Sequence, residues 1–272
     1  MKCPIDGKQM DFAFKATVLG KYDVSYYRCG TCSLIQPQEP YWLEEAYSSA
    51  IADTDVGLVL RNRLNWRRLA PLLHRIASSE ARILDVGGGY GLLCRGLRDD
   101  GFDCYTTDAY CENLFAKGFE PGDGFSAEVL LAFEVMEHIT NPLAFVREQL
   151  AKYGADTLVF STLTHSSSAP PPLDWWYHVF ESGQHVSLYH ENSLQALAAE
   201  LGLNLYSLSK DFHVLTRHRL FSLDLWYLQR RRLGLFYEAW VGFARRGRSW
   251  LERDYQAVKS KAGVRSPASL QE

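Results

Sequence analysis

The stretch RILDVGGGYG, residues 82–91, decides the fold that this sequence predicts. Ile83, Leu84 and Val86 are apolar and compatible with a short buried strand. Glycine fills four of the next five positions, which indicates a tight turn, and the residues LLCRGLRDD that follow return to helical spacing. A strand, a glycine turn and a helix form the first unit of a doubly wound α/β sheet, whose ligands bind at the carboxyl ends of the strands.

The spacing of the glycines narrows the choice of ligand. A dinucleotide fingerprint, G-x-G-x-x-G, that starts at Gly87 needs its third glycine at the position of Leu92. Here Asp85 is instead followed by glycine at every second position. A further acidic residue, Asp108, comes directly after FDCYTT, the expected second strand, where a carboxylate can accept hydrogen bonds from both hydroxyls of a ribose. The pattern favours a ribose-containing ligand other than a dinucleotide.

With these features the chain resembles the class I S-adenosylmethionine-dependent methyltransferases. Their motif is an acidic residue followed by G-x-G-x-G after strand one, with a second acidic residue at the end of strand two. The resemblance implies S-adenosyl-L-methionine as cofactor and a Rossmann-like doubly wound sheet with a closing antiparallel strand pair. The cofactor-binding positions that it implies are Asp85, Gly87, Gly88, Gly89, Gly91, Asp108 and, after strand four, Glu134. The alternative is a glycine-rich turn that binds no ligand.

Composition limits the other function classes. The chain has 272 residues, enough for one large domain or for one domain with an appendage, and its formal net charge of -3 gives no global field that would attract nucleic acid. The first residues lack the apolar region of a secretory signal, and no apolar run is long enough to cross a bilayer. Six cysteines without an export signal favour reduced thiols or metal ligands. We expect a cytoplasmic protein.

Residues 1–40 differ from the rest and predict a small zinc-ribbon-like module. Cys29-Gly30-Thr31-Cys32 is a complete C-x-x-C knuckle, whereas the turn Cys3-Pro4-Ile5-Asp6 has an aspartate where a second knuckle needs its second cysteine. Zinc accepts aspartate oxygen as well as thiolate, so a structural zinc site is expected. Its ligands would be Cys3, Asp6, Cys29 and Cys32. The alternative is a degenerate ribbon that keeps its shape by packing alone.

Residues 41–80 predict a helical connector. The expected buried face carries Leu60, Leu64, Leu69, Leu72 and Leu73. The expected wet face carries Arg61, Arg63, Arg67 and Arg68. In the family that the chain resembles, the helix before strand one covers the cofactor, which implies that Tyr47 or Arg61 touches the methionine carboxylate.

Residues 81–217 carry the predicted catalytic fold. Strand four is expected at 128–133 and strand five at 156–164. Strand three of the family cannot be identified after Asp108, and Asp123 is a weak candidate for the residue that reads the adenine amino group.

The stretch AFEVMEH, residues 132–138, resembles the segment that lines the sulfonium end of the cofactor in the same family. Glu137 and His138 are a familiar pair there. The alternative is structural, a turn carboxylate and a capping imidazole, and for His138 we favour the structural role.

A proline-broken and aromatic segment, 165–190, follows strand five, where the acceptor pocket of a doubly wound sheet lies. Aromatic faces suit a sulfonium or a stacked substrate ring. The substrate-binding candidates are Asp174, Trp175 and Trp176, and the catalytic candidates are His185, Glu181 and Tyr177. His185 is the first candidate for a general base, because an imidazole titrates near neutrality. The alternative is that its ring anchors the loop by hydrogen bonds.

The WWY cluster followed by GQH also resembles a bacterial methyltransferase subgroup. Those proteins carry an N-terminal cysteine-rich region too, and many are linked to sugar, polysaccharide or small-metabolite pathways. This resemblance covers roughly residues 1–217 and says little about the acceptor.

The end of the chain predicts more helix. A helix is expected at 191–203, with Asn192 as N-cap and Gly202 at its end, followed by the closing strand pair. Residues 218–272 form a basic, aromatic, helical extension. One interpretation is a surface for an acidic membrane or RNA. The other, which we favour, is a pair of helices that packs on the domain or on a second subunit as a homodimer.

Three functions stay open. The first is a methyltransferase acting on a hydroxyl, amine or carbon of a small-molecule or sugar-type acceptor. The second is an RNA methyltransferase that uses the ribbon and the arginine-rich tail, against which stand the net charge and the absence of an Asn/Asp-Pro-Pro-aromatic motif after strand four. The third is a non-catalytic scaffold with the same fold.

Overall fold

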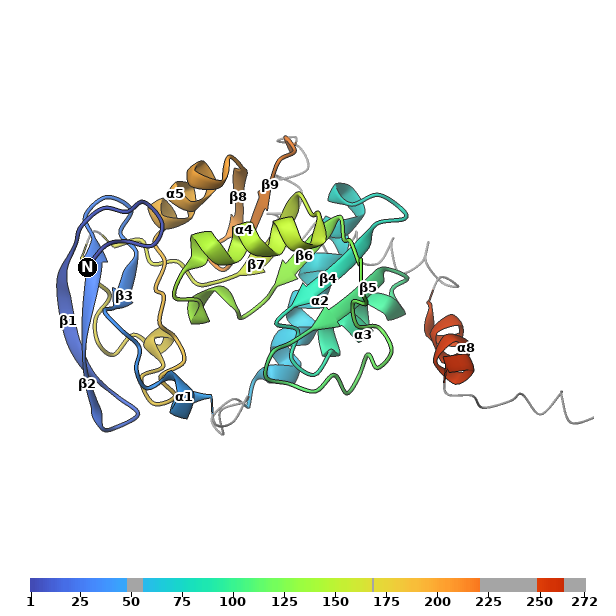
Figure 1. Cartoon of the computed structure of the whole chain (residues 1–272), viewed down its shortest axis with the longest axis horizontal. Coiled ribbons are helices and arrows are strands. Elements are labelled where there is room, and N and C mark those ends of the chain that lie inside the picture. Colours follow the sequence, from blue (N-terminus) through green and yellow to red (C-terminus); the bar gives the residue numbers. More distant parts are fainter. Residues whose placement is uncertain (48–55, 168, 221–248, 262–272) are drawn as a thin grey trace, which may run out of the picture.

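The computed structural model describes residues 1–47, 56–167, 169–220 and 249–261. They form a six-stranded sheet covered by helices on both faces and a separate three-stranded sheet at the N-terminal end (Figure 1). The large sheet has the strand order β5-β4-β6-β7-β9-β8. Its members are β4 (Arg82–Val86), β5 (Asp103–Thr107), β6 (Val129–Ala132), β7 (Thr157–Ser161), β8 (Asn204–Ser209) and β9 (Phe212–Thr216).

The direction of the strands confirms the predicted doubly wound sheet with its closing pair. Strands β5, β4, β6 and β7 run parallel, and β9 is antiparallel to both β7 and β8. The structure assigns no strand to residues 108–128, so β5 is the edge of the sheet. One backbone hydrogen bond from Thr106 N to Phe119 O, at 2.9 Å, ties this irregular segment to the edge strand. The missing third strand is therefore a feature of the fold.

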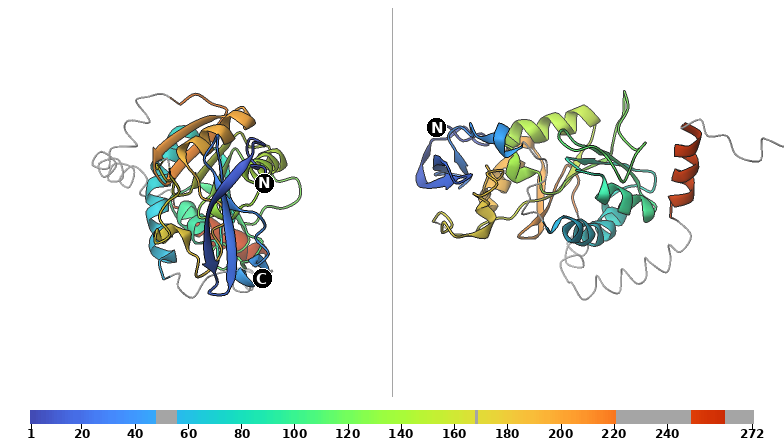
Figure 2. Two further views of the ribbon diagram at one scale, coloured as in Figure 1. Left: turned by 90° about the vertical axis from the view of Figure 1, so that its left-hand side faces the viewer. Right: turned by 90° about the horizontal axis from the view of Figure 1, so that it is seen from below.

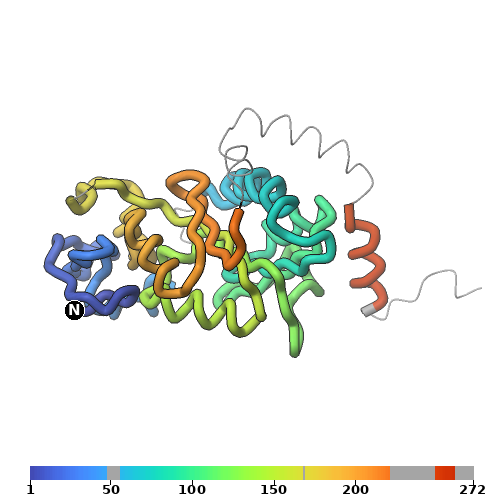
Figure 3. The backbone as a smooth tube through the Cα atoms, turned by 90° about the horizontal axis from the view of Figure 1, so that it is seen from above, coloured from blue at the N-terminus to red at the C-terminus, as the bar shows by residue number. Residues whose placement is uncertain are grey.

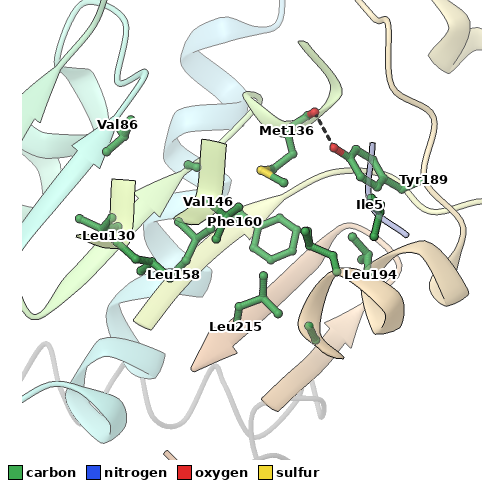
Figure 4. Packing of buried hydrophobic residues seen from close by; sticks show 14 of the residues in the cluster. Ile5, Val86, Leu130, Met136, Val146, Leu158, Phe160, Tyr189, Leu194 and Leu215 are labelled. Atoms are coloured by element: carbon green, nitrogen blue, oxygen red, sulfur yellow. Dashed lines mark hydrogen bonds between the residues drawn. The ribbon is translucent and has the colours of Figure 1, made fainter. Parts of the chain in front are cut away.

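Alternate side chains of the parallel strands enter two cores. Leu84, Leu130 and Leu158 pack under α4 (Pro142–Tyr153) and α5 (Glu191–Leu201). Their neighbours Ile83, Val129 and Val159 point to the opposite face, under α2 (Leu58–Ile76) and α3 (Leu92–Asp99). This alternation follows from the two-residue period of a strand. Figure 4 shows the first core closely, with Phe160 and Leu215 at its centre.

The N-terminal sheet lies beside the main sheet and is joined to it (Figures 2 and 3). It contains β1 (Met10–Val18), β2 (Tyr22–Cys29) and β3 (Ile35–Pro37), and the short α1 (Leu43–Ala46) follows. Ile35 and Leu188 exchange two backbone hydrogen bonds of 3.0 and 2.9 Å. Ile5 also enters the main core next to Tyr189, whose hydroxyl donates to the Met136 carbonyl at 3.0 Å (Figure 4). The module is thus continuous with the sheet domain.

The predicted buried face of α2 is wrong in its first half. Leu69, Leu72 and Leu73 are buried, but Leu60 and Leu64 are 52% and 46% exposed. The reason is that the first half of α2 extends past the edge of the sheet core. Its first turns lie over a cavity and turn Arg61, expected to face water, toward that cavity. Only its second half covers the sheet.

The predicted N-cap of α5 is wrong by two residues. His190 is the cap: its Nδ1 accepts a hydrogen bond from Asn192 N at 3.0 Å, and its own N–H donates to Ser193 Oγ at 3.1 Å. The helix begins at Glu191, so Asn192 lies in its first turn. Gly202, in the left-handed conformation, ends the helix as expected.

The described part of the C-terminal extension is α8 (Leu251–Lys261), at the end of the molecule opposite the N-terminus (Figure 1). Asp254 joins it to α3 through two hydrogen bonds of 2.7 Å with Arg98, which is also buried. A helix packed on the domain agrees with the favoured prediction for this segment. Most of the arginines and aromatic residues of the extension lie in 221–248, outside the described residues. Residues 48–55 of the connector are also outside the described residues.

Among the described helices, none combines the length and the apolar character that a membrane span needs.

Candidate functional site

A cavity of about 610 Å³ opens at the carboxyl ends of β4 and β6. Its wall is built from the glycine turn, the first turns of α2, the segment after β6 and the segment 176–185. A second cavity of about 340 Å³ adjoins it and lies along the end of β5. The two cavities share Gly89, Asp108 and Cys111. They form one recess where a doubly wound sheet is expected to bind its ligand.

The structure shows why glycine is needed in this turn, and the reason differs from one position to another. A Cβ at Gly88 would collide with Thr106 Oγ1 and lie 2.6 Å from Asp85 Oδ2, so packing beneath the turn excludes a side chain. Gly89 has φ +57° and open space where its Cβ would be, so backbone is exposed to the cavity there. Gly87 and Gly91 have φ +70° and +82°. Gly91 does not line the larger cavity and instead starts α3.

Asp85 lies at the floor of the larger cavity and is only 1% exposed. Its Oδ2 has no hydrogen-bond partner. Burial, reinforced by the nearby charge of Asp108, raises the pKa of the Asp85 carboxyl to about 8. A buried carboxylate oxygen without a donor is a group that a bound cation or N–H donor would stabilise.

Asp108 joins the two turns that carry the recess. Its Oδ2 accepts from Gly89 N at 2.9 Å, and its Oδ1 accepts from Tyr110 N at 2.7 Å and Cys111 N at 2.8 Å. A carboxylate has about four lone-pair sites, so capacity for further donors stays open. Asp108 therefore both fixes the loop after β5 and offers oxygen to a ligand.

Glu134 stands at the end of β6 in a strained backbone conformation, with φ +56°. Its Oε1 accepts from Ser161 Oγ at 2.8 Å, and its Oε2 lies 3.4 Å from Arg61 Nε of α2. A non-glycine residue in the left-handed region is uncommon and is found where the surroundings hold it. These contacts turn the Glu134 side chain to the cavity.

Glu137 is completely buried behind this wall. Its Oε1 accepts from the Tyr177 hydroxyl at 2.7 Å, and its Oε2 has no partner. Burial and the nearby Glu134 raise the pKa of the Glu137 carboxyl to about 8. Leu163 N also donates to the Tyr177 hydroxyl, at 3.0 Å, so that the phenol is oriented to donate to Glu137.

Two imidazoles line the cavity next to Glu137. The rings of His138 and His185 are perpendicular, with centroids 5.0 Å apart. His138 Nδ1 lies 2.9 Å from the Tyr47 hydroxyl, and His185 Nδ1 lies 2.8 Å from the Tyr177 carbonyl oxygen. Burial lowers the pKa of His138 to about 3 and that of His185 to about 4, so both rings are neutral at pH 7. Because a carbonyl only accepts, the His185 proton is on Nδ1 and its lone pair on Nε2.

The other predicted substrate and catalytic residues are divided between the cavity and its surroundings. Trp176, 72% exposed, lines the cavity together with Glu181 and Tyr177. Trp175 does not line it and packs against Tyr177 and His178, with centroids 5.3 Å from each. Asp174 is exposed outside the cavity. Asp123, the weak adenine candidate, is also exposed and lines neither cavity.

The cysteine-rich turns come together at the end of the N-terminal sheet. Cys3 Sγ and Cys32 Sγ are 3.6 Å apart, and Cys29 Sγ is 3.4 Å from Asp6 Oδ2. The hydrogen bond from the Cys32 thiol lowers the pKa of Cys3 to about 7. One ligand atom from each of the four residues lies within 4.8 Å of the others. We call Cys3, Asp6, Cys29 and Cys32 the thiolate cluster.

Several residues of the recess were not identified from the sequence. Asn62 and Asn65 of α2 and Gln184 line the larger cavity, and Asn113 and Glu120 line the smaller one. Cys111 is partly exposed and lines both cavities. Polar residues on the inner face of α2, at 61, 62 and 65, were the available signal, because helical spacing places them on one side.

Comparison with known protein families gives one match. The model of the methyltransferase domain family matches residues 60–208. No match was found among curated proteins.

Solved structures are similar to this chain at low identity. TnmH is 17% identical over 66% of this chain and 62% of its own, with a TM-score of 0.48. Magnesium protoporphyrin IX methyltransferase from Synechocystis PCC 6803, with bound SAH, is 14% identical over 64% of this chain and 90% of its own, with a TM-score of 0.43. Mitomycin 7-O-methyltransferase MmcR is 15% identical over 64% and 59%, with a TM-score of 0.42. The match thus spans less than two thirds of TnmH and of the mitomycin enzyme.

Proposed function

The chain belongs to the methyltransferase domain family, whose model matches more than half of its 272 residues, and we propose that it transfers the methyl group of S-adenosyl-L-methionine to a small-molecule or sugar-type acceptor. The observation that carries this proposal is the recess at the carboxyl ends of β4, β5 and β6, where open glycine backbone and Asp108 lie side by side. The backbone at Gly89 leaves room for a nucleoside, and a carboxylate beside it suits ribose hydroxyls.

The two cavities suit the two halves of the cofactor. The smaller one, lined by Asp108, Asn113 and Glu120, would take the adenosine. The larger one would take the methionine, with its carboxylate near Arg61 and Tyr47 and its cationic sulfonium near Glu134. Asp85, at the floor with an unpartnered oxygen, would then face a cationic ligand.

The acceptor would enter between Trp176 and the buried wall that carries His185. Methyl transfer is a displacement at carbon, and the protein mainly has to position and desolvate the nucleophile. In our proposal the Nε2 lone pair of His185 takes the proton of the acceptor, and the Tyr177 carbonyl, 2.8 Å from Nδ1, holds the ring. Glu181, on the same cavity wall, is the second candidate for the base.

Calorimetric titration with S-adenosylhomocysteine tests the cofactor. We expect micromolar binding to the wild type and at least tenfold weaker binding to Asp108→Ala, because the loop after β5 and the ribose acceptor are lost together. Glu148→Gln, an exposed change on α4, is the matched control and should bind as the wild type does. No binding by a folded wild type would contradict the proposal and favour a non-catalytic scaffold. An acceptor screen read by S-adenosylhomocysteine release then separates small molecules from RNA, for which salt-sensitive binding is required.

We further propose that the thiolate cluster binds one structural zinc ion. Three thiolates and one carboxylate oxygen are a donor set that zinc accepts in a tetrahedral site, and the metal itself favours the deprotonated thiols. Metal analysis of the purified chain should find zinc in the wild type and a reduced content in Cys32→Ser. Equal zinc in both proteins would contradict this assignment.

A further inference from the structure

We infer that Glu137, His138 and His185 form a divalent-cation site that opens to the acceptor side of the cavity. This inference deepens the proposed function and rests on it for the identity of the reaction, but cation binding itself can be measured without turnover. One carboxylate oxygen of Glu137 and one ring nitrogen of each histidine lie within 4.8 Å of one another. We call these three residues the carboxylate–histidine triad.

The first argument is the unpaired oxygen of Glu137. The side chain is 0% exposed, Tyr177 occupies Oε1, and Oε2 has no hydrogen-bond partner. Within the described residues no salt bridge reaches this carboxyl. An uncompensated polar atom at this depth is unfavourable, and a cation is one way to satisfy it.

The second argument is the orientation of the imidazoles. The His185 lone pair is on Nε2 because Nδ1 faces a carbonyl, and the hydroxyl of Tyr47 at 2.9 Å is able to accept the Nδ1 proton of His138. Metal-binding histidines characteristically donate their other N–H to such a partner. Both rings line the cavity, whereas Glu137 lies behind them.

The third argument is that one residue, Tyr177, makes hydrogen bonds to two of the three proposed ligands. Tyr177 donates its hydroxyl to Glu137 and offers its carbonyl to His185, so a single residue orients two of the three ligands. Leu163 N fixes that hydroxyl in turn, at 3.0 Å. Outer-shell hydrogen bonds of this kind hold the ligands of metal sites in position. A hydrogen-bonded cluster that only stabilises the loop does not need the unpartnered Glu137 oxygen.

The donor set selects the class of cation. Two neutral imidazoles and one carboxylate suit first-row divalent metals such as manganese, iron, cobalt or zinc, and leave coordination positions for an oxygen of the acceptor. A cation held there would lower the pKa of that oxygen, and its proton would pass to water or to Glu181. The oxygen–methyl bond then forms as the methyl–sulfur bond breaks, and neutral S-adenosylhomocysteine leaves. His185 would in this case bind the cation instead of taking the proton.

Cobalt titration of the full chain tests the inference, because cobalt bound to thiolate has a charge-transfer absorption that cobalt bound to nitrogen and oxygen lacks. We expect one Co²⁺ per chain without this absorption, in addition to any ion in the thiolate cluster. Glu137→Gln, His138→Gln and His185→Gln should each remove that ion, or weaken it at least tenfold, and leave the thiolate absorption unchanged. Tyr177→Phe should weaken it about tenfold through the lost hydrogen bond. Glu181→Gln, a carboxylate of the same cavity outside the triad, should bind cobalt as the wild type does.

Circular dichroism and S-adenosylhomocysteine binding report whether each variant is folded. A wild type that binds cobalt only through thiolate, or triad variants that bind it as well as the wild type, would overturn the inference. In that case intact S-adenosylhomocysteine binding would leave the proposed methyl transfer standing. Cobalt binding to the triad without any cofactor binding would give the opposite result: the site would exist and the proposed function would fail.

Discussion

The thiolate cluster and the carboxylate–histidine triad each bring together side chains that can bind a metal ion, but the chain assembles them in different ways. Each has its ligand atoms within 4.8 Å of one another. The cluster comes from two turns at the ends of a three-stranded sheet, each with its two ligands three positions apart. The triad combines a neighbouring pair after β6 with a residue that follows 47 positions later along the chain, held by hydrogen bonds of Tyr177.

The different surroundings of the two sites predict different effects of substitution. Cys3, Cys29 and Cys32 of the cluster are buried in the core that the module shares with the main sheet, so a metal there would join two turns of the chain and act on stability. His138 and His185 of the triad line the cavity, so a metal held by the triad would meet a bound acceptor. Substitutions in the cluster should therefore act on unfolding, and substitutions in the triad should act on activity.

The largest expected effect is loss of stability from Cys32→Ser. Removing one thiolate from the cluster should abolish tight zinc binding and lower the free energy of unfolding by about 3 kcal/mol or more, because metal-binding free energy in such modules is folding free energy. Denaturant unfolding with and without added zinc measures this. Cys111→Ser, a partly exposed thiol outside the cluster, should change stability by less than about 0.5 kcal/mol. If Cys32→Ser is as stable as the wild type with and without zinc, the cluster does not determine stability.

The next effect is loss of activity from Glu137→Gln without loss of stability. The amide has the shape of the carboxylic acid, so Tyr177 keeps a partner while the anionic ligand is removed. We expect methyl transfer to fall about 100-fold, which is about 2.7 kcal/mol in the barrier, with a free energy of unfolding within about 1 kcal/mol of the wild type. Product release under saturating cofactor and thermal unfolding measure the two. A variant that loses stability but keeps its activity per folded molecule would show that Glu137 acts on the fold and not on the reaction.

The same contrast explains what the sequence could predict. The glycine turn, the individual strands and the two cysteine turns were identified because each is a pattern within a few positions, and the pairing of the two turns followed from their likeness to the two knuckles of a zinc ribbon. The first half of α2 was wrong because helical periodicity shows which side chains share a face and not whether that face meets a core or a cavity. His190 was missed as a cap because the imidazole competes there with an asparagine of higher intrinsic preference.

The triad itself was only half visible. Glu137 and His138 were identified as a pair from the resemblance, and His185 was proposed from its position after strand five, but nothing in the sequence joined them. Their meeting depends on how the segment 176–187 folds back, with Val186 N and Ser187 N both donating to the Glu137 carbonyl at 2.9 Å. Contacts between such distant residues are decided by tertiary packing, which local patterns do not encode.

A smaller effect separates two glycines at the cavity floor, Gly88 and Gly89. Gly88→Ala should lower the free energy of unfolding by about 2 kcal/mol, since its Cβ collides with Thr106 Oγ1 in a packed site. Gly89→Ala meets no atom within 4 Å but must keep φ +57°, so about 1 kcal/mol is expected. Gly89→Ala should weaken S-adenosylhomocysteine binding more than it weakens the fold, because its methyl group enters the cavity. Equal losses of stability would mean that the turn shifts to accept both.

The smallest effect, per pH unit, is a pH slope of opposite sign at the thiolate cluster and at the cavity floor that carries Asp85. The thiolate cluster must release protons to bind zinc, so its contribution to stability rises with pH. Asp85 behaves in the opposite way: its pKa is raised from 3.8 to about 8 in the folded chain, so between these values the folded state holds a proton that the unfolded state has lost. Its contribution is fully present below about pH 4, falls by about 1.4 kcal/mol per pH unit as pH rises, and is constant above about pH 8.

Asp85→Asn isolates this contribution, because the amide does not titrate. Denaturant unfolding of both cofactor-free proteins, in excess zinc so that the thiolate cluster is saturated, should give a wild-type stability that falls relative to the variant between pH 6 and pH 7, by about 1.4 kcal/mol. The shared zinc-dependent slope cancels in the difference. If the two pH profiles run parallel, the Asp85 carboxyl is not held neutral at the cavity floor, and the contrast between a cluster that needs anions and a floor that disfavours one would be lost.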